Sequence, residues 1–311
     1  KPRTSSTDTD RFRVKSGFAV RYKQKGGTKT ISLDQKGFNQ ITFRGEYPIA
    51  KVTFEQEDLP FKVTLNSYSP FIPLNVKDSS IPVTIMTYEF TNEDSKELNL
   101  DIGGWLENKV CPEVTDVSFK RKNKVIESKS KTTVFMTALG KGLSSRKGYG
   151  DMAISLMDSS SNVNAFAALE SDKYMSNVFD QKANSEKTTS AIETLVGGVS
   201  TSISLKQGES KKVTFLLSWY FPHYNEMSNN AMGMVNGIEN LKRYYAKHFE
   251  NANDVAEYVV DDFERLSGTT LEWNNTWYDS TLPYWFLDRS FISLDCLASQ
   301  TSHLFNTDRF W

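Results

Sequence analysis

The side chains best suited to metal binding and nucleophilic chemistry are few in this sequence and widely spaced. The cysteines are Cys111 and Cys296, and the histidines are His223, His248 and His303. They form neither an HExxH motif nor a Cys/His cluster, so no metal site is predicted and no cofactor is expected. We interpret the cysteines as two buried thiols, with a single bridge between them as the alternative. His303 follows a predicted helix and could approach a pocket, but a structural role is favoured.

Carboxylates are numerous, but their positions do not indicate an acid/base pair. Four lie in predicted strands or loops and are interpreted as solvated: Glu107, Asp116, Glu170 and Asp172. Four more share one face of a predicted helix, interpreted as its outer, solvated face: Asp254, Glu257, Asp261 and Glu264. Serine is common, yet the G-x-S-x-G motif does not occur. The residues alone therefore predict no catalytic centre in this chain.

Two polar stretches are interpreted as loops. The stretch from Gly140 to Gly150 reads GKGLSSRKGYG, which has the glycines of a phosphate cradle. It lacks the Walker spacing and the Lys-Ser/Thr ending, so a nucleotide site is not expected. The stretch from Lys120 to Lys131 is rich in Lys and Ser and is predicted to be a solvated hairpin.

Composition limits the classes of partner. The chain has 311 residues, with 37 basic and 38 acidic side chains, and this near-balance argues against nucleic acid as a partner. No apolar run approaches the roughly 18 residues of a membrane-spanning helix, and no signal peptide is recognised. Residues 1–10 are polar and predicted to be a disordered tail. The compartment stays open: a soluble protein is expected, with bacterial export favoured over the cytoplasm.

The elements that must position any site begin with a long β region, predicted to span residues 11–225. Apolar and polar residues alternate there in short runs separated by Gly, Pro, Asn and Asp, as expected for many short antiparallel strands. The clearest run is predicted to point one face into the core: Val213, Phe215, Leu217 and Trp219. No βαβ rhythm appears, so a doubly wound sheet is excluded. The predicted fold is mainly β, a large two-sheet antiparallel sandwich.

The periodicity changes after this region. Residues 226–240 are predicted to be a linker, and residues 241–311 to be helical. Apolar residues recur at steps of three and four from Leu241 to Leu266, which predicts an amphipathic helix that Gly268 interrupts. A second helical segment is predicted from 271 to 277. Pro283 then suits the first turn of a buried helix that continues to about Leu304.

Several segments together resemble glycoside hydrolase family 116, which contains retaining β-glucosidases and the non-lysosomal glucosylceramidases. The first is WYDSTLPYWFLDRSF, at residues 277–291. The others are GEYPIAKVTFEQEDLPFKVTLNSYSPFIPLNVKDSSIPVTIMTYEFTN at 45–92, GWLEN at 104–108, LLSWYFPHYN at 216–225 and YYAKHFENANDVAEYV at 244–259. The resemblance covers most of the chain.

The resemblance implies that residues 11–225 are an N-terminal sandwich without catalytic residues, and that the helices open an (α/α)6 catalytic barrel. The family's nucleophilic Glu and acid/base Asp would then lie downstream of Trp311, so no catalytic residue is expected within this chain. Trp311 is a candidate for stacking against a sugar. The implied function is the non-catalytic part of a retaining hydrolase of β-glucosides such as glucosylceramide or aryl and alkyl glucosides. The implied partner contact is intramolecular, between sandwich and helical domain.

Two alternatives stay open. The chain could be a stand-alone carbohydrate-binding or scaffold sandwich without enzyme activity. It could also belong to another sugar enzyme that joins a sandwich to an (α/α)6 barrel, such as a glycoside phosphorylase, although the segment matches argue against this. An open reading frame that continues past Trp311 with a helical pattern would favour the glycosidase.

Overall fold

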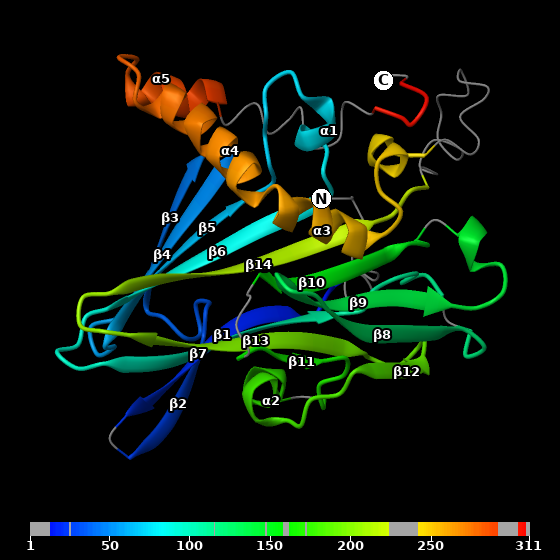
Figure 1. Cartoon of the computed structure of the whole chain (residues 1–311), viewed down its shortest axis with the longest axis horizontal. Coiled ribbons are helices and arrows are strands. Elements are labelled where there is room, and N and C mark those ends of the chain that lie inside the picture. The colour runs from blue at the N-terminus through cyan, green and yellow to red at the C-terminus, as the bar shows by residue number, and fades with distance from the viewer. Residues whose placement is uncertain are drawn as a thin grey trace.

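The computed structural model describes residues 13–24, 26–114, 116–146, 148–157, 162–171, 173–223, 242–291 and 304–308. These residues form two antiparallel sheets, one of five strands and one of nine, with helices outside them. The two sheets lie face to face in Figure 1. The predicted two-sheet antiparallel sandwich is confirmed.

The small sheet has five strands. Its order is β11 (Asn164–Phe166), β13 (Val196–Leu205), β7 (Leu98–Glu107), β1 (Ser16–Gln24) and β2 (Gly27–Ser32). The large sheet has nine, in the order β12 (Glu186–Ser190), β8 (Lys120–Glu127), β9 (Lys131–Leu139), β10 (Asp151–Met157), β14 (Ser210–Tyr220), β6 (Val83–Asn92), β5 (Phe61–Tyr68), β4 (Ile49–Glu55) and β3 (Gln40–Glu46).

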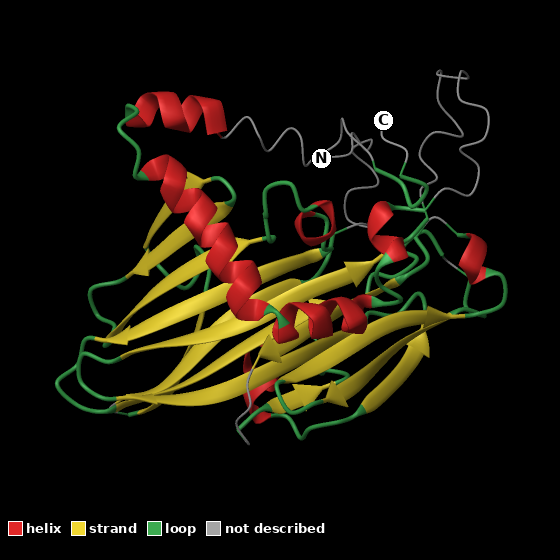
Figure 2. Cartoon of the chain, turned by 45° about the horizontal axis from the view of Figure 1, so that its top comes forward, coloured by secondary structure: helices red, strands yellow, loops and turns green. Residues whose placement is uncertain are grey.

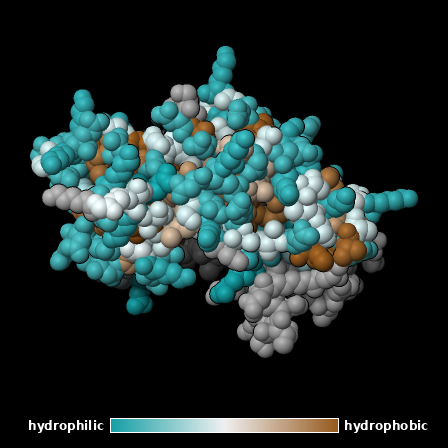
Figure 3. Space-filling model, turned by 90° about the horizontal axis from the view of Figure 1, so that it is seen from below, coloured by the Kyte–Doolittle hydropathy of each residue, from teal (hydrophilic) through white to brown (hydrophobic). Residues whose placement is uncertain are grey.

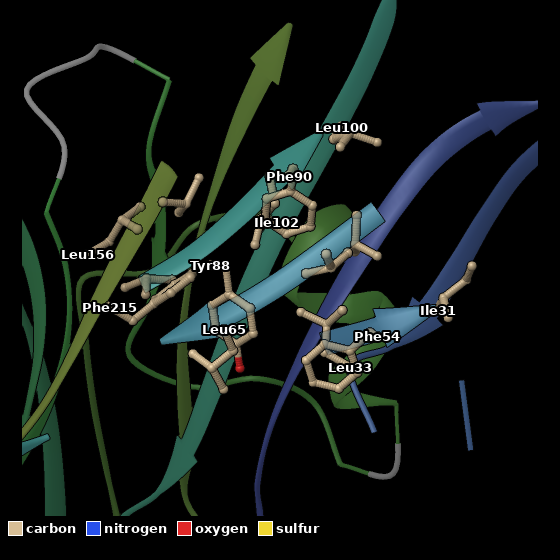
Figure 4. Close-up of a cluster of buried hydrophobic side chains, with 14 of the residues drawn as sticks. Ile31, Leu33, Phe54, Leu65, Tyr88, Phe90, Leu100, Ile102, Leu156 and Phe215 are labelled. Atoms are coloured by element: carbon tan, nitrogen blue, oxygen red, sulfur yellow. The ribbon is translucent and has the colours of Figure 1, made fainter. Parts of the chain in front are cut away.

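The core between the sheets follows from the alternation along each strand. On β14, Val213 and Phe215 are buried in the core and Leu217 packs against it, as predicted, while Trp219 is half-buried. Phe18 of β1 reaches the large sheet, where its ring centroid lies 5.1 Å from that of Phe215. Figure 4 shows buried apolar side chains from both sheets lying together, including Phe215 and Tyr88 of the large sheet and Leu100 and Ile102 of the small one. Their burial removes much apolar area from water and is the main source of the sandwich's stability.

Helices occupy the outer faces of the sandwich. Two helices lie between strands in the sequence, α1 (Val76–Ser79) and α2 (Tyr174–Asp180). Three follow the last strand: α3 (Ala252–Asp261), α4 (Phe263–Tyr278) and α5 (Tyr284–Phe291). Single 3-10 turns lie at Leu143–Ser145 and Tyr244–Lys247. Figure 2 shows α3 and α4 crossing the outside of the large sheet, and α2 contacts β7 and β13 of the small sheet.

The helical region begins and breaks at other places than predicted. The first α-helix starts at Ala252 instead of Leu241, because the Asn251 side chain accepts the Asp254 N–H and caps it there. The break falls at Asp262, where the backbone leaves helical geometry, and not at Gly268. Gly268 lies inside α4 with open space around it, and a glycine in a helix costs only about 1 kcal/mol. α5 begins one residue after Pro283, as predicted.

The predicted solvated hairpin from Lys120 to Lys131 is wrong in its solvation. The residues do form a hairpin, but they belong to β8 and to the first position of β9, and several polar side chains are buried. Arg121 donates from Nε to the carbonyl of Val110 at 3.2 Å, and Asn123 pairs with Asn108 at 2.9 Å. The high charge content of this stretch predicted that its side chains face solvent. Their hydrogen-bond partners instead compensate the cost of burying the polar groups.

Two boundaries predicted from sequence lie outside the described residues. These are the tail at 1–10 and the linker at 226–240. The helix predicted to run to about Leu304 is described as far as Phe291. The prediction is wrong at its end, because Leu304 belongs to a short extended stretch that accepts the Tyr244 N–H.

We predict that the core, and not hydrophobicity in general, sets the stability of the sandwich. Ile102 is fully buried on β7, so Ile102→Ala should lower the free energy of unfolding by about 2–5 kcal/mol. The matched change Ile192→Ala, at an exposed isoleucine, should stay within about 0.5 kcal/mol of the parent. Urea unfolding followed by circular dichroism measures both. Equal losses for the two variants would contradict this assignment of the core.

Candidate functional site

The outer face of the large sheet carries a second apolar layer, which the helices cover. Val83 and Ile85 of β6 point away from the core between the sheets, as does Leu216 of β14. They pack against Val255 and Val259 of α3. Both faces of the central strands are therefore buried, one by the small sheet and one by helices. This layer sets the position of α3 and of the start of α4 on the sheet.

Asp78 links three elements beneath these helices. Its carboxylate is 1% exposed and accepts hydrogen bonds from Tyr258 Oη, Arg265 Nη1 and Asn75 Nδ2, each at 2.7 Å. Burial and the hydrogen bond to Asp78 raise the pKa of Tyr258 to about 12. Because a buried charge is tolerated only when it is paired and hydrogen-bonded, this cluster holds α1, α3 and α4 in one arrangement.

Lys131 forms a comparable contact at the start of β9. Its side chain is 1% exposed, and its Nζ donates to Asn253 Oδ1 at 2.7 Å and to Thr133 Oγ1 at 3.3 Å. Glu257 Oε1 lies 3.5 Å away. Burial lowers the pKa of Lys131, and the Glu257 carboxylate opposes that shift. The ammonium therefore ties α3 to the sheet.

Asp151 closes the amino end of α3. It is the first residue of β10, and its carboxylate accepts the backbone N–H of Ala252, the first residue of the helix. Ser218 Oγ donates to the Ala252 carbonyl at 2.7 Å, which adds a second link to the same residue. Burial raises the pKa of Asp151 to about 7, although the backbone hydrogen bond favours the charged form.

An aromatic row continues from the sheet to the last helix. Phe71 contacts Tyr47 and Trp273, each at 5.4 Å between ring centroids, and Trp273 stands 5.4 Å from Trp277. Trp277 then meets Phe291 of α5 at 4.1 Å. The indole N–H groups of both tryptophans are buried, and neither makes a hydrogen bond within the described part of the chain. Buried indole N–H groups usually have a hydrogen-bond partner, so these two tryptophans are exceptions within the described part of the chain.

The exposed side of α5 begins with three aromatic rings, which are followed by the exposed residues Asp288, Arg289 and Ser290. Tyr284, Trp285 and Phe286 are 62%, 67% and 41% exposed, whereas Leu287 and Phe291 are buried toward α4. We call the three exposed rings the α5 aromatic face. Exposed groups of large apolar side chains are less common than single ones on protein surfaces.

The structure describes only some of the other candidate residues. Trp311, Cys296, His303 and Asp172 lie outside the described residues. Cys111 is a buried free thiol, as predicted, and burial raises its pKa to about 11. Burial lowers the pKa of His223 and of His248, which favours neutral rings in both. Among the candidates that the structure describes, no side-chain hydrogen bond joins a nucleophile to a base.

The prediction that Glu107 is solvated is wrong. Its side chain is 1% exposed, forms an ion pair with Lys109 at 2.9 Å and accepts the Lys15 backbone N–H at 2.9 Å. The alternation along the strand could have placed Glu107 on the outer face of β7. It could not have shown that another segment of the protein, which includes Lys15, covers that position. Asp116 and Glu170 are exposed, as predicted.

The acidic helix face is only partly as predicted. Glu257, Asp261 and Glu264 are exposed, but Glu257 reaches Lys131, and Asp254 accepts the backbone N–H of Glu250 at 2.9 Å. Glu264 stands on α4 and not on the same helix as the others, because the chain breaks at Asp262. The carboxylates therefore serve helix ends and ion pairs.

Neither a metal centre nor a membrane-spanning helix is seen in the described part of the chain. No three His, Cys, Asp or Glu side chains gather there in a way that would hold a metal ion. No described helix is long and apolar enough to cross a membrane.

Comparison with known proteins bears on both the sandwich and the helices. The family described as beta-glucosidase 2, glycosyl-hydrolase family 116 N-term matches residues 8–266, which include the whole sandwich, α3 and the start of α4. This match extends past the last strand, so the family's domain includes the helix that covers the large sheet.

Solved structures show a more distant likeness. A protein described as a kojibiose phosphorylase from the human microbiome is 11% identical, with a TM-score of 0.39 over 83% of this chain and 27% of that one. A galactose mutarotase-like protein from Lactobacillus casei is 10% identical, with a TM-score of 0.30 over 66% of this chain and 85% of that one. The chain thus spans about a quarter of the kojibiose phosphorylase (27%), and likenesses at this level identify no activity.

We predict that Asp151 makes stability fall as pH rises. Its folded pKa of about 7 exceeds the ordinary value of 3.8, so the folded protein binds more protons than the unfolded chain between these values. The free energy of unfolding should therefore decrease as pH rises from 3.8 to about 7, by up to about 1.4 kcal/mol per pH unit. Above about pH 7, Asp151 should cause no further change.

Asp151→Asn should remove this slope, because the amide oxygen can still accept the Ala252 N–H without titrating. Urea unfolding of both proteins at a series of pH values from about 4 to about 8 measures the difference. Identical pH profiles for the variant and the parent would contradict the assignment.

Proposed function

We infer that this chain, which belongs to glycoside hydrolase family 116 through its N-terminal domain, braces the catalytic domain of a β-glucosidase-like enzyme. In this proposal the chain supplies a non-catalytic sandwich and the first helices of a helical domain. The catalytic groups lie outside residues 1–311.

The bonding of the buried carboxylates supports a non-catalytic role. Asp78, Glu107 and Asp151 each hold structural partners: helix side chains, a lysine and a helix end, respectively. A retaining glycosidase needs two carboxylates about 5–5.5 Å apart across the scissile bond, with one as nucleophile and the other as acid/base. No hydrogen bond joins any two of these three carboxylates in the described part of the chain, and each is instead bonded to a structural group.

The α5 aromatic face is the observation that carries the proposal. Tyr284, Trp285 and Phe286 gain little by facing water, since burying one large apolar side chain is worth about 1.5–3 kcal/mol. A helical domain packed on α5 would cover them and would also bring groups near the buried indoles of Trp273 and Trp277. We propose that this domain is an (α/α)6 barrel, with α5 among its first helices.

The proposed reaction is hydrolysis of a β-glucoside with retention of configuration. A carboxylate nucleophile would form a glycosyl-enzyme, and a carboxylic acid would protonate the leaving oxygen and later activate water. Glucosylceramide and aryl or alkyl glucosides are the substrate classes considered. Trp311 stays a prediction for sugar stacking. A stand-alone sandwich is the less favoured alternative, because it leaves the α5 aromatic face without a function.

We predict that the 311-residue chain alone does not hydrolyse aryl β-glucosides, because both proposed carboxylates are outside it. In the longer protein, a cyclophellitol-type reagent should label one glutamate, and peptide mapping should place that residue after Trp311. Release of aryl alcohol from substrate measures the first point. A labelled glutamate within this chain, or turnover abolished by changing one of its carboxylates, would refute the proposal.

We also predict that the isolated chain self-associates through the α5 aromatic face. Trp285→Ala should reduce binding of a hydrophobic dye and shift the protein toward monomer, while the sandwich stays folded. Phe43→Ala is a matched control, since Phe43 is likewise 67% exposed but lies on edge strand β3. Sedimentation velocity and dye fluorescence measure these effects. A soluble monomer that binds no dye would instead favour the stand-alone module.

A further inference from the structure

A hollow of about 740 Å³ opens beside the edge of the small sheet, away from the helices that follow the last strand. Strand β2 and the loop at 34–39 form one side of it, and Trp105 of β7 and Met175 of α2 line another. Its volume falls within the range of about 300–1,000 Å³ usual for small-molecule sites. Figure 3 shows the molecule from below, the side where Figure 1 places α2, and this surface is mostly hydrophilic with hydrophobic residues in small groups.

Trp105 has an unusual support. Leu106 and Ile102 point into the core, so Trp105 points to the outer face of the small sheet. Its partner across the ladder is Gly17 of β1, and a Cβ at Gly17 would collide with a carbon of the indole ring. The ring therefore lies over the backbone at Gly17 and also packs against the buried cluster of Phe166, Leu169, Val178 and Val196. It is half-buried, and its accessible part lines the hollow.

The loop opposite the indole is shaped by Asp34. Its Oδ1 accepts hydrogen bonds from Ser32 Oγ at 2.7 Å and from the backbone N–H groups of Lys36 and Gly37 at 2.8 and 3.3 Å. Such an Asx arrangement holds a tight turn without help from a ligand. The hollow is thus bordered by an ordered loop.

Three amide side chains around the hollow, unlike Ser32 and Asp34, are not engaged with other described residues. Gln35 and Asn39 from the loop and Gln56 after β4 line it, and their amides make no side-chain hydrogen bond to another described residue. Each amide carries two donors and one acceptor oxygen. The lysines Lys29 and Lys36 add two ammonium donors at the same wall.

We propose that this hollow binds a saccharide, with a pyranose ring stacked on Trp105 and its hydroxyls bonded by the amides of Asn39 and Gln56. A sugar ring offers an apolar C–H face to an aromatic ring and hydroxyls, at once donors and acceptors, around its edge. Those are the two kinds of group this hollow presents. A phosphate ligand fits less well, because the carboxylate of Asp34 stands in the same loop.

Calorimetric titration of the 311-residue chain with cellotetraose tests this, with glycerol as a polyol that has no ring face. The choice of a glucose oligomer rests on the proposed function, but the site does not. Cellotetraose should bind and glycerol should not. Trp105→Ala should weaken binding about tenfold, and Trp105→Phe should recover most of it. Trp285→Ala, at an exposed tryptophan on α5, should bind like the parent.

A second variant protects the test from a folding defect. Asn39→Ala combined with Gln56→Ala changes side chains at the rim and should weaken binding about fivefold with the thermal midpoint unchanged. No heat from cellotetraose, or equal affinity in the parent and the double variant, would overturn the proposal. Because the assay involves no hydrolysis, its failure would leave the proposed glycosidase untouched, and an inactive parent enzyme would leave this site untouched.

Discussion

The structure depends on the burial of both faces of the central strands of the large sheet. Strands β6 and β14 place aromatic rings in the core between the sheets and aliphatic side chains such as Ile85 and Leu216 on the outside. That outer layer would be exposed if the chain ended with its last strand. Helix α3 covers it, so the sandwich and its first long helix form one structural unit. The family match from 8 to 266 has the same extent.

Buried charges then determine how that helix lies. Hydrophobic packing is non-directional and would permit α3 to slide or rotate over the sheet. Asp78 and Lys131 each require a partner at a particular position, because an unpaired buried charge is costly. Asp151, which is partly buried, accepts the N–H at the start of α3. Together they contact the beginning, middle and end of the helical segment. The contact between Arg265 and Asp78 also helps to set the orientation of α4, which leads to α5.

The two aromatic surfaces differ in kind. The α5 aromatic face consists of exposed rings on the surface of a helix, which suits the proposed coverage by another protein domain. Trp105 is held flat by Gly17 beside a concave, polar-rimmed hollow, which suits a small hydroxylated ligand. Aromatic content alone does not distinguish these uses; the curvature and the polarity around each ring do.

The alternation of residues such as Val213 and Phe215 by itself determined the sandwich, because a period of two has only one favourable arrangement on a half-buried strand. The segment matches likewise determined the family. Only the tertiary structure decided that Glu107 and Lys131 are buried, since each bonds to a partner distant in sequence, the Lys15 N–H for Glu107 and the Asn253 amide oxygen for Lys131. It also decided the break at Asp262 and the hollow beside Trp105. The hollow is lined by residues from separate elements, for which a local pattern carries no signal.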